Sequence, residues 1–270
     1  MEGGVKAPPK ADLDWVAAAV GAPVIGARPL AGGGWHVNHV VTVRGGREFV
    51  LRRWARPEWT HEDPGFTPER EARALELMEQ SAVRTPRAIA VGSELLLTDK
   101  LPGRPPPLKP RDIDRFVEQL AAALPAIHAV EGDLPRYERY YAQPTVPDSD
   151  VWHRAAALTA EPPPPGPTCL IHRDYHPGNT LWSRGRLTGV VDWTQASIGP
   201  AAVDVGHMRW NLALDYGLDA AARFLAHAEA GPDQSYWDVV TALDALPDID
   251  PSRHPELERY VATCFPHPHA

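Results

Sequence analysis

The sequence predicts an α+β fold of two lobes, with an antiparallel sheet in residues 1–102 and a mainly helical part in residues 103–270. Three observations favour this fold class. Short β-branched segments joined by glycine turns dominate the first lobe. Apolar residues at helical spacing dominate the second lobe. Between them stands the proline run at residues 105–107, which is typical of an extended connection.

The first lobe should begin with a short helix over residues 11–21, opened by Asp12 and closed by Gly21. A second helix should begin at Pro68, because Thr67 is a good N-cap and proline is favoured at the first helical position. Glycines at 45–46 and at 92 indicate hairpin turns. The expected strands cover residues 24–30, 37–43, 47–53, 88–91 and 95–99.

The second lobe should be helical, with its catalytic loop inside a small β-element. Apolar residues from Ile113 to Ile127 lie on one helical face, and Pro125 should kink or break that helix. Short strands are expected at 168–172, 180–182 and 187–191, the last two forming a hairpin around Gly185. Further helices are expected at 150–160, 203–214, 220–230, 236–246 and 255–264.

Composition excludes several classes of protein. The net charge of −8 argues against a nucleic-acid partner, which normally requires a basic surface. No apolar run approaches the ~20 residues that a membrane span needs, and no secretory signal is visible. Two cysteines cannot form a disulfide framework or a cysteine-based zinc site. We therefore expect a cytoplasmic protein without a membrane partner, and the oligomeric state stays open.

The acidic excess is uneven along the chain. Residues 193–270 contain eight Asp, three Glu, four Arg and no Lys, a balance of −7. A solvated acidic surface explains this, and so does a lobe that attracts cationic ligands.

The most informative residues are Asp174, Asn179 and Asp192. Asp174 precedes Asn179 by five residues on a polar loop, and Asp192 ends the next expected strand. This pattern suits phosphoryl transfer, in which one carboxylate orients the acceptor hydroxyl and takes its proton. The amide oxygen and the second carboxylate are hard ligands of the kind Mg²⁺ prefers.

Other interpretations exist for the same residues. Asp174 and Asn179 could form an Asx-turn pair that shapes a Pro-Gly loop, and Asp192 could cap the following turn. His172, Asp174 and His176 could instead be alternate-residue metal ligands of a hydrolase. That interpretation needs further ligands and leaves Asn179 and Asp192 without a role.

The stretch from His172 to Asn179, followed by Val190 to Trp193, resembles the catalytic and metal loops of the aminoglycoside phosphotransferase family, relatives of the protein kinases. The resemblance spans about residues 30–210 in order and spacing. It implies a protein-kinase-like fold, Asp174 as catalytic base or acceptor-orienting group, and Asn179 and Asp192 as Mg²⁺ ligands. ATP or GTP would be the phosphate donor.

Upstream segments extend this resemblance to the nucleotide site. Residues 32–38 are similar to the nucleotide loop, with Gly33 and Gly34 approaching phosphate and Asn38 adding a donor, although glycines here could also be a flexible connection. Residues 96–103 resemble the hinge. Backbone groups of Asp99 and Leu101 would face the base there, and the sequence does not choose between adenine and guanine.

The phosphate clamp departs from the kinase pattern. Lysine is absent from the expected third strand, and Arg52, or less plausibly Arg53, takes its place. Arginine can clamp phosphates in a bidentate manner and pair with Glu71. Arg52 could also be an ordinary surface residue, and Glu71 is favoured in a first helical turn by the macrodipole alone.

Four further residues flank the expected site. His172 should bury its ring and hold the loop, and Asp204 should accept hydrogen bonds from the loop backbone. His176 could face the acceptor or be merely exposed. Trp193 could shape the acceptor site, although a core aromatic is the simpler interpretation.

Together these residues predict a small-molecule kinase whose acceptor is an aminoglycoside-like or other small molecule. One alternative is a non-catalytic nucleotide-binding relative, suggested by Arg52 and the loose glycine loop. Another is a kinase of a sugar, a macrolide or another metabolite.

Overall fold

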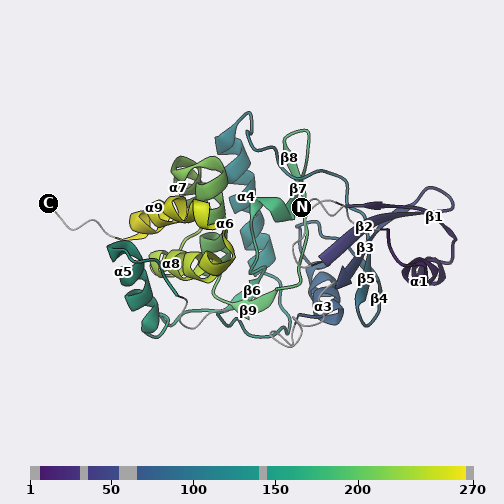
Figure 1. Ribbon diagram of the computed structural model, residues 1–270, viewed down its shortest axis with the longest axis horizontal. Helices are drawn as coiled ribbons and strands as arrows, with labels where there is room; N and C mark the ends of the chain where they lie inside the picture. Colours follow the sequence, from purple (N-terminus) through teal and green to yellow (C-terminus); the bar gives the residue numbers. More distant parts are fainter. Residues whose placement is uncertain (1–6, 31–35, 55–65, 140–144, 266–270) are drawn as a thin grey trace.

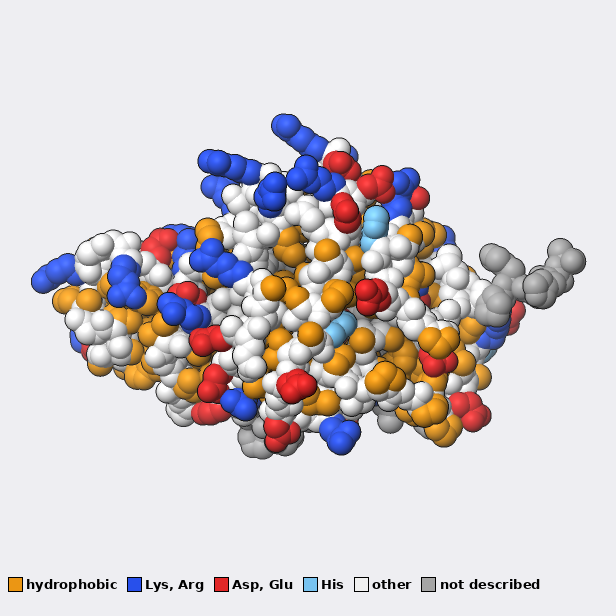
Figure 2. All heavy atoms as spheres, turned by 180° about the vertical axis from the view of Figure 1, so that it is seen from behind, with side chains coloured by type: hydrophobic (Ala, Val, Ile, Leu, Met, Phe, Trp, Pro, Cys, Tyr) orange, Lys and Arg blue, Asp and Glu red, His pale blue; other side chains and the backbone are white. Residues whose placement is uncertain are grey.

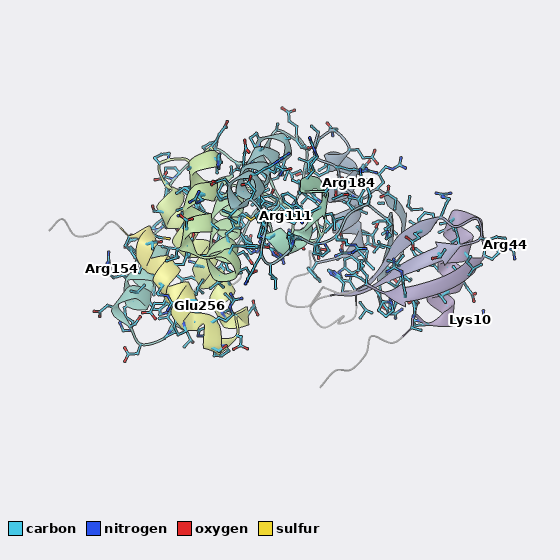
Figure 3. All side chains as sticks on the ribbon, turned by 90° about the horizontal axis from the view of Figure 1, so that it is seen from above. Lys10, Arg44, Arg111, Arg154, Arg184 and Glu256 are labelled. Carbon is cyan, nitrogen blue, oxygen red and sulfur yellow. The ribbon has the colours of Figure 1, made fainter. Side chains whose placement is uncertain are left out.

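A computed structural model describes residues 7–30, 36–54, 66–139 and 145–265. It has the expected α+β, protein-kinase-like architecture: a strand-rich lobe at one end and a helical lobe at the other (Figure 1). Seen from above, Lys10 and Arg44 mark the outer end of the first lobe, and Arg154 and Glu256 mark the outer end of the second (Figure 3). The boundary near residue 102 stays a prediction.

The first lobe is built on an antiparallel five-stranded sheet of order β1-β2-β3-β5-β4. Glycine turns close its hairpins, and Gly45 and Gly46 both have positive φ, which suits glycine. The strands are β1 (Val24–Pro29), β2 (His36–Val43), β3 (Glu48–Trp54), β4 (Ala88–Val91) and β5 (Leu95–Asp99).

The two faces of β3 decide which arginine reaches the space between the lobes. Side chains alternate along a strand, so Leu51 and Arg53 share one face and Arg52 takes the other. Helix α1 (Lys10–Val20) covers the first face, where Arg53 Nη1 lies 2.6 Å from Asp12 Oδ2. Asp12 therefore ties α1 to the sheet. The sequence had suggested that Asp12 opens this helix, but the N-cap residue is Pro9, without a side-chain hydrogen bond.

Helix α3 (Pro68–Met78) packs on the opposite face, towards the second lobe (Figure 1). It begins as expected, because the Thr67 side chain accepts a hydrogen bond from the backbone N–H of Arg70 at 3.2 Å. Leu75 and Met78 of this helix are fully buried in the main hydrophobic core.

The second lobe is mainly helical. Helix α4 (Ile113–His128) continues through Pro125 to His128, so a break there is wrong, and a kink at Pro125 stays a prediction. Pro125 lies in the last turn, where it removes only one ladder hydrogen bond, and the buried stripe containing Leu120, Leu124 and Ile127 holds the helix together. The remaining helices are α5 (Asp150–Ala160), α6 (Ala202–Tyr216), α7 (Leu218–His227), α8 (Gln234–Ala245) and α9 (His254–Cys264).

Two small strand pairs lie between the lobes. The first joins β6 (Cys169–Ile171) to β9 (Ser197–Gly199), a strand that the sequence did not predict. The second is the expected hairpin of β7 (Thr180–Ser183) and β8 (Arg186–Val190). The loop 172–179 runs from β6 to β7, so both ends of this loop are anchored by strands.

Candidate active site

The backbone of the loop that carries Asp174 is held by the side chain of Asp204, a residue in the first turn of α6. Asp204 is fully buried, and its carboxylate accepts hydrogen bonds from the backbone N–H groups of His172 (2.9 Å) and Arg173 (2.7 Å). His128 Nε2 lies 3.0 Å from the same carboxylate. Two hydrogen bonds from N–H groups to one buried anion fix the backbone immediately before Asp174.

His172 supports the loop from inside. Its ring is fully buried, and its Nε2 donates to the carbonyl of Val191 at 3.0 Å. The ring also packs on Trp193, with 4.5 Å between ring centroids. His172 therefore joins the catalytic loop to the chain beside Asp192, which is a structural role.

Asp174 projects from this loop with a different donor on each carboxylate oxygen. His207 Nε2 lies 3.1 Å from Oδ1, and Asn179 Nδ2 donates to Oδ2 at 2.8 Å. His176 Nε2 is farther from Oδ2, at 3.9 Å. Burial would raise the pKa of Asp174, but His176, His207 and His172 outweigh it and hold that pKa below its usual range. Asp174 is thus ionised at neutral pH and able to accept a proton.

Sequence reasoning missed His207, which lies three residues after Asp204 on α6. Positions i and i+3 share a helix face. Since Asp204 was expected to support the catalytic loop, a histidine one turn later was the signal that could have pointed to this contact.

The turn after Asp174 is shaped by His176. Its Nδ1 accepts from the backbone N–H of Gly178 at 3.2 Å, opening a 3₁₀ turn over Pro177–Asn179. A Cβ on Gly178 would stand 2.6 Å from the His176 ring, so this close approach requires glycine. The His176 side chain is partly exposed beside Asp174, so it can still face an acceptor.

Asn179 and Asp192 are brought together by the β7–β8 hairpin. Thr180 pairs with Val190 at its open end, and the N–H of Val191 donates to the carbonyl of Asn179 at 2.9 Å. Asn179 uses its amide nitrogen on Asp174, which leaves Oδ1 for another ligand. Asp192 uses Oδ1 on Arg52 and Thr194, which leaves Oδ2. Two hard oxygens at one hairpin end fit Mg²⁺.

No cluster of three His, Cys, Asp or Glu side chains that could hold a metal occurs in the described ranges. The hydrolase interpretation, in which His172, Asp174 and His176 bind a metal, is also opposed by their contacts. His172 Nε2 is committed to the Val191 carbonyl, and His176 Nδ1 to Gly178.

Arg52 is the centre of a buried polar network on the first-lobe side. Its guanidinium lies 3.0 Å from Glu71 Oε2 and 2.7 Å from Asp192 Oδ1. It also lies 3.3 Å from Thr194 Oγ1 and 3.0 Å from His36 Nδ1. The guanidinium has no acceptor site, so His36 must present an unprotonated Nδ1.

The network shifts the pKa values of its members in opposite directions. Burial raises the pKa of Glu71, even though Arg52 opposes this shift. Burial would also raise the pKa of Asp192, but Arg52 and then His36 bring it below its ordinary value. Burial, reinforced by Arg52, lowers the pKa of His36 to about 3, which keeps that imidazole neutral.

The other residues expected to bind the nucleotide differ in where they lie and in which partners they have. Asn38 lies on β2 opposite Arg52, and its buried Oδ1 has no partner within the residues that the structure covers. Gly33 and Gly34 lie outside the described residues. Asp99 ends β5 and accepts from the Arg87 backbone N–H at 2.6 Å.

At the hinge, Leu101 is a buried side chain, so any contact with a nucleotide base must come from its backbone. Trp193 has no exposed surface and donates its Nε1–H to the Val190 carbonyl at 3.1 Å. This burial agrees with the simpler interpretation of Trp193 as a core aromatic and leaves no surface through which it could contact an acceptor.

Several acidic side chains of the second lobe form ion pairs with arginines. Asp238 pairs with Arg209, Asp244 with Arg139 and Asp215 with Arg253. Over one face of the molecule, acidic side chains are interspersed with basic and hydrophobic ones (Figure 2). These three carboxylates are therefore not free for a cationic ligand, and the interpretation of this lobe as a cation attractor stays a prediction.

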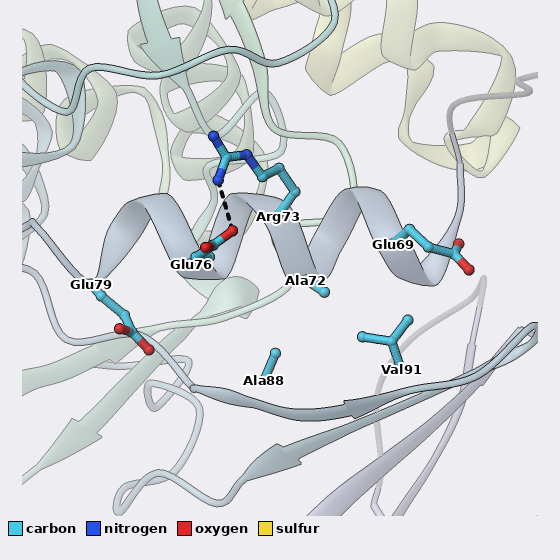
Figure 4. A pocket seen from close by; sticks show the side chains of 7 residues that line it. All are labelled: Glu69, Ala72, Arg73, Glu76, Glu79, Ala88 and Val91. Carbon is cyan, nitrogen blue, oxygen red and sulfur yellow. Dashed lines mark hydrogen bonds and ion pairs between the residues drawn. The ribbon is translucent and has the colours of Figure 1, made fainter.

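A cavity of about 420 Å³ lies between α3 and β4 (Figure 4). Its helical lining has the spacing of a single helix face, whereas Glu71 and Leu75 lie on the other face. The cavity is thus separate from the Asp174 and Asp192 groups. It is lined by Glu69, Ala72, Arg73, Glu76, Glu79, Ala88 and Val91.

Comparisons with known proteins agree with the kinase-like fold of the chain. The model of the phosphotransferase enzyme family matches residues 27–243, which is well over half of the chain. A search of curated proteins found no match. In the described ranges, no helix is both long enough and apolar enough to span a membrane.

Solved structures with the same fold include several antibiotic phosphotransferases. The macrolide 2'-phosphotransferase MphH from Brachybacterium faecium has a TM-score of 0.64 and 21% identity, covering 97% of this chain and 100% of that one. The aminoglycoside phosphotransferase APH(4)-Ia with ADP and hygromycin B has a TM-score of 0.66 and 19% identity, covering 93% and 96%. The GDP and kanamycin complex of APH(2")-IIIa has a TM-score of 0.62 and 17% identity, covering 93% and 98%.

Proposed function

The chain belongs to the phosphotransferase enzyme family and is a phosphotransferase acting on hydroxyl groups; we propose that it transfers the γ-phosphate of ATP or GTP to a small-molecule acceptor beside Asp174. One observation carries this proposal. The β7–β8 hairpin places the free oxygens of Asn179 and Asp192 at its open end, and Asn179 also donates to the Asp174 carboxylate at 2.8 Å. The side chain of Asn179 thus belongs to the proposed metal-binding pair and also contacts the proposed base, Asp174.

Asp174 acts on the acceptor. Its ionised carboxylate orients the acceptor hydroxyl and accepts its proton as the oxygen attacks the γ-phosphorus. Asn179 and Asp192 would hold Mg²⁺, which neutralises charge on the nucleotide phosphates. Arg52 lies on the opposite side of Asp192 and supplies positive charge from the first lobe.

The acceptor is a compound with a hydroxyl group, and the side chains around Asp174 indicate which class of compound fits. Beside Asp174, the His207 ring packs edge-to-face on Trp210 with 5.0 Å between centroids, and the His176 ring centroid lies 6.0 Å from that of His207. Three second-lobe carboxylates, those of Asp215, Asp238 and Asp244, are paired with arginines. This lining favours an acceptor with few positive charges, such as a macrolide or a sugar, over a polycationic aminoglycoside. A role in antibiotic resistance follows if the acceptor is an antibiotic, and a cytoplasmic location stays a prediction.

A non-catalytic nucleotide-binding protein is the second candidate. The observation that favours it is the saturation of Arg52, which is buried and already contacts Glu71 and Asp192. Arg52 could then be structural and unavailable to phosphate. Turnover separates the two candidates, because only the kinase releases a nucleoside diphosphate in response to an acceptor.

The test measures ADP or GDP release from Mg·ATP or Mg·GTP against a panel of macrolides, aminoglycosides and sugars. We expect acceptor-dependent release that Asp192→Asn abolishes by removing the charge that holds the metal. The matched control is Asp148→Asn, an aspartate with a fully exposed side chain, which should retain the parent rate. Nucleotide binding without release for any acceptor would favour the second candidate.

A further inference from the structure

The strongest unexplained contact lies on the acceptor side of the site, between His207 and Asp174. His207 is on α6, and its Nε2 lies 3.1 Å from Asp174 Oδ1. A carboxylate can only accept a hydrogen bond, so Nε2 carries the proton and donates. With Asn179 donating to Oδ2 at 2.8 Å, each oxygen of Asp174 has its own N–H donor.

The His207 ring is itself held in place. It packs edge-to-face on Trp210, one turn further along α6, with 5.0 Å between centroids. The carbonyl of His207 accepts from Asn211 Nδ2 at 2.9 Å. A donor with few alternative orientations can fix the direction of the group that it contacts.

Helix α6 therefore contacts the catalytic loop at two places, its backbone and the side chain of Asp174. Asp204 fixes the loop backbone through the N–H groups of His172 and Arg173. His207, three residues later, contacts the carboxylate that the loop presents. The two contacts share one helix face, so α6 contacts both the backbone of the loop and the carboxylate that the loop presents.

His176 has a different role, although it lies closer to Asp174 along the chain. Its Nε2 is 3.9 Å from Asp174 Oδ2, which is too far for a hydrogen bond, and its Nδ1 is used on Gly178. Of these two histidines, only His207 has the geometry to orient the carboxylate.

We propose that His207 is a positioning residue that aligns the Asp174 carboxylate with the acceptor hydroxyl. The inference rests on the proposed function. In the step, the acceptor oxygen forms a bond to the γ-phosphorus while its proton passes to Asp174. The bond from the γ-phosphorus to the β–γ bridging oxygen breaks, and the nucleoside diphosphate leaves with the electron pair. His207 keeps its proton throughout and directs which lone pair of Asp174 faces the hydroxyl.

The activity test compares His207→Phe, which keeps a ring but has no donor, with His207→Gln, whose amide nitrogen can reach the position of Nε2. We expect kcat of His207→Phe to fall about 10- to 100-fold, as for a misaligned catalytic group, with the nucleotide KM unchanged. His207→Gln should recover most of kcat. His153→Gln, a histidine with an exposed side chain on α5, is the matched control.

The rate is measured both with the acceptor panel and with water as the acceptor in slow Mg·ATP or Mg·GTP hydrolysis, which needs no identified substrate. A kcat for His207→Phe within twofold of the parent would overturn the proposal, and so would a glutamine variant no better than phenylalanine. A rise in nucleotide KM at constant kcat would also overturn it, because that result indicates a binding role.

A second readout does not depend on turnover. The ring ¹⁵N resonances of His207 in the full chain should report a protonated Nε2, and Asp174→Asn should shift them while leaving His153 unchanged. An unchanged His207 ring would overturn the proposal even in an active enzyme. If the parent shows neither transfer nor hydrolysis, the proposed function fails, and the resonances still decide whether His207 holds Asp174.

Discussion

The two carboxylates of the site, Asp192 and Asp174, are held in different ways. Their side chains are similarly accessible, 22% and 28% exposed. Asp192 is held by a cation, since Arg52 lies 2.7 Å from its Oδ1. Asp174 is held by the imidazole N–H of His207 and the amide N–H of Asn179.

This difference suits the roles proposed for the two carboxylates. A guanidinium offsets the charge of Asp192 and fixes the place of a carboxylate that would hold a metal. An amide donor orients an anion without cancelling its charge, so Asp174 keeps the negative charge that attracts a proton. The buried ionic network of the first lobe therefore fixes the place of Asp192. The hydrogen bonds of the second lobe fix the direction in which the Asp174 carboxylate points.

The comparison breaks most visibly if the charge of Asp174 is removed. Asp174→Asn keeps the shape and removes the proton acceptor, so kcat should fall by about 10²- to 10⁴-fold while nucleotide KM stays nearly unchanged. Steady-state kinetics with the best acceptor measures both. Near-normal transfer would remove Asp174 from the mechanism and leave charge stabilisation by metal and Arg52 as the main effect.

The first-lobe network should respond in stability as well as in activity. Glu71→Ala removes one of the two carboxylates that contact the buried Arg52 in the described residues, and loss of one partner of a buried ion pair should cost about 3 kcal/mol of unfolding free energy. Denaturant unfolding measures this value. Glu76→Ala on the same helix removes an exposed pair with Arg73 and should cost about 0.5 kcal/mol or less. Equal costs would show that the Arg52 network contributes no more than a surface pair.

The low pKa of His36 predicts a pH dependence of stability. The pKa is about 3 in the folded chain and 6.5 in the unfolded chain, so the unfolded state binds the proton first as the pH falls. This contribution is present above pH 6.5 and is lost towards pH 3. Between pH 7 and pH 5 the parent should lose about 2 kcal/mol more stability than His36→Gln. Parallel curves for the two proteins would show that His36 does not titrate as a buried group.

The smallest expected effect sharpens the same comparison. Thr194 Oγ1 lies 2.9 Å from Asp192 Oδ1 and 3.1 Å from Glu71 Oε2, so its hydroxyl links the two carboxylates around Arg52. Thr194→Val keeps the shape and should cost about 1 kcal/mol, the value of one hydrogen bond. The exposed Thr168→Val is the control and should change stability little. A neutral Thr194→Val would show that Arg52 alone holds this network.

The sequence by itself determined the fold class, most elements and the order of the site residues. Strand alternation places Arg52 and Arg53 on opposite faces of β3, although the sequence left open which of the two faces the second lobe. The same local rules gave Thr67 as a helix cap and the hairpin around Gly185. The loop from His172 to Asn179 also followed from the sequence, since its residue types and spacing are local properties.

Only the tertiary structure decided which groups touch. The pairing of Arg52 with Asp192 joins residues 140 positions apart, and the contact of His207 with Asp174 depends on how α6 docks under the catalytic loop. The burial of Trp193, the continuity of α4 through Pro125 and the pairing of the second-lobe acids also depend on packing. Periodicity and capping act within a few residues, whereas the partner of a polar side chain is set by which elements pack against it.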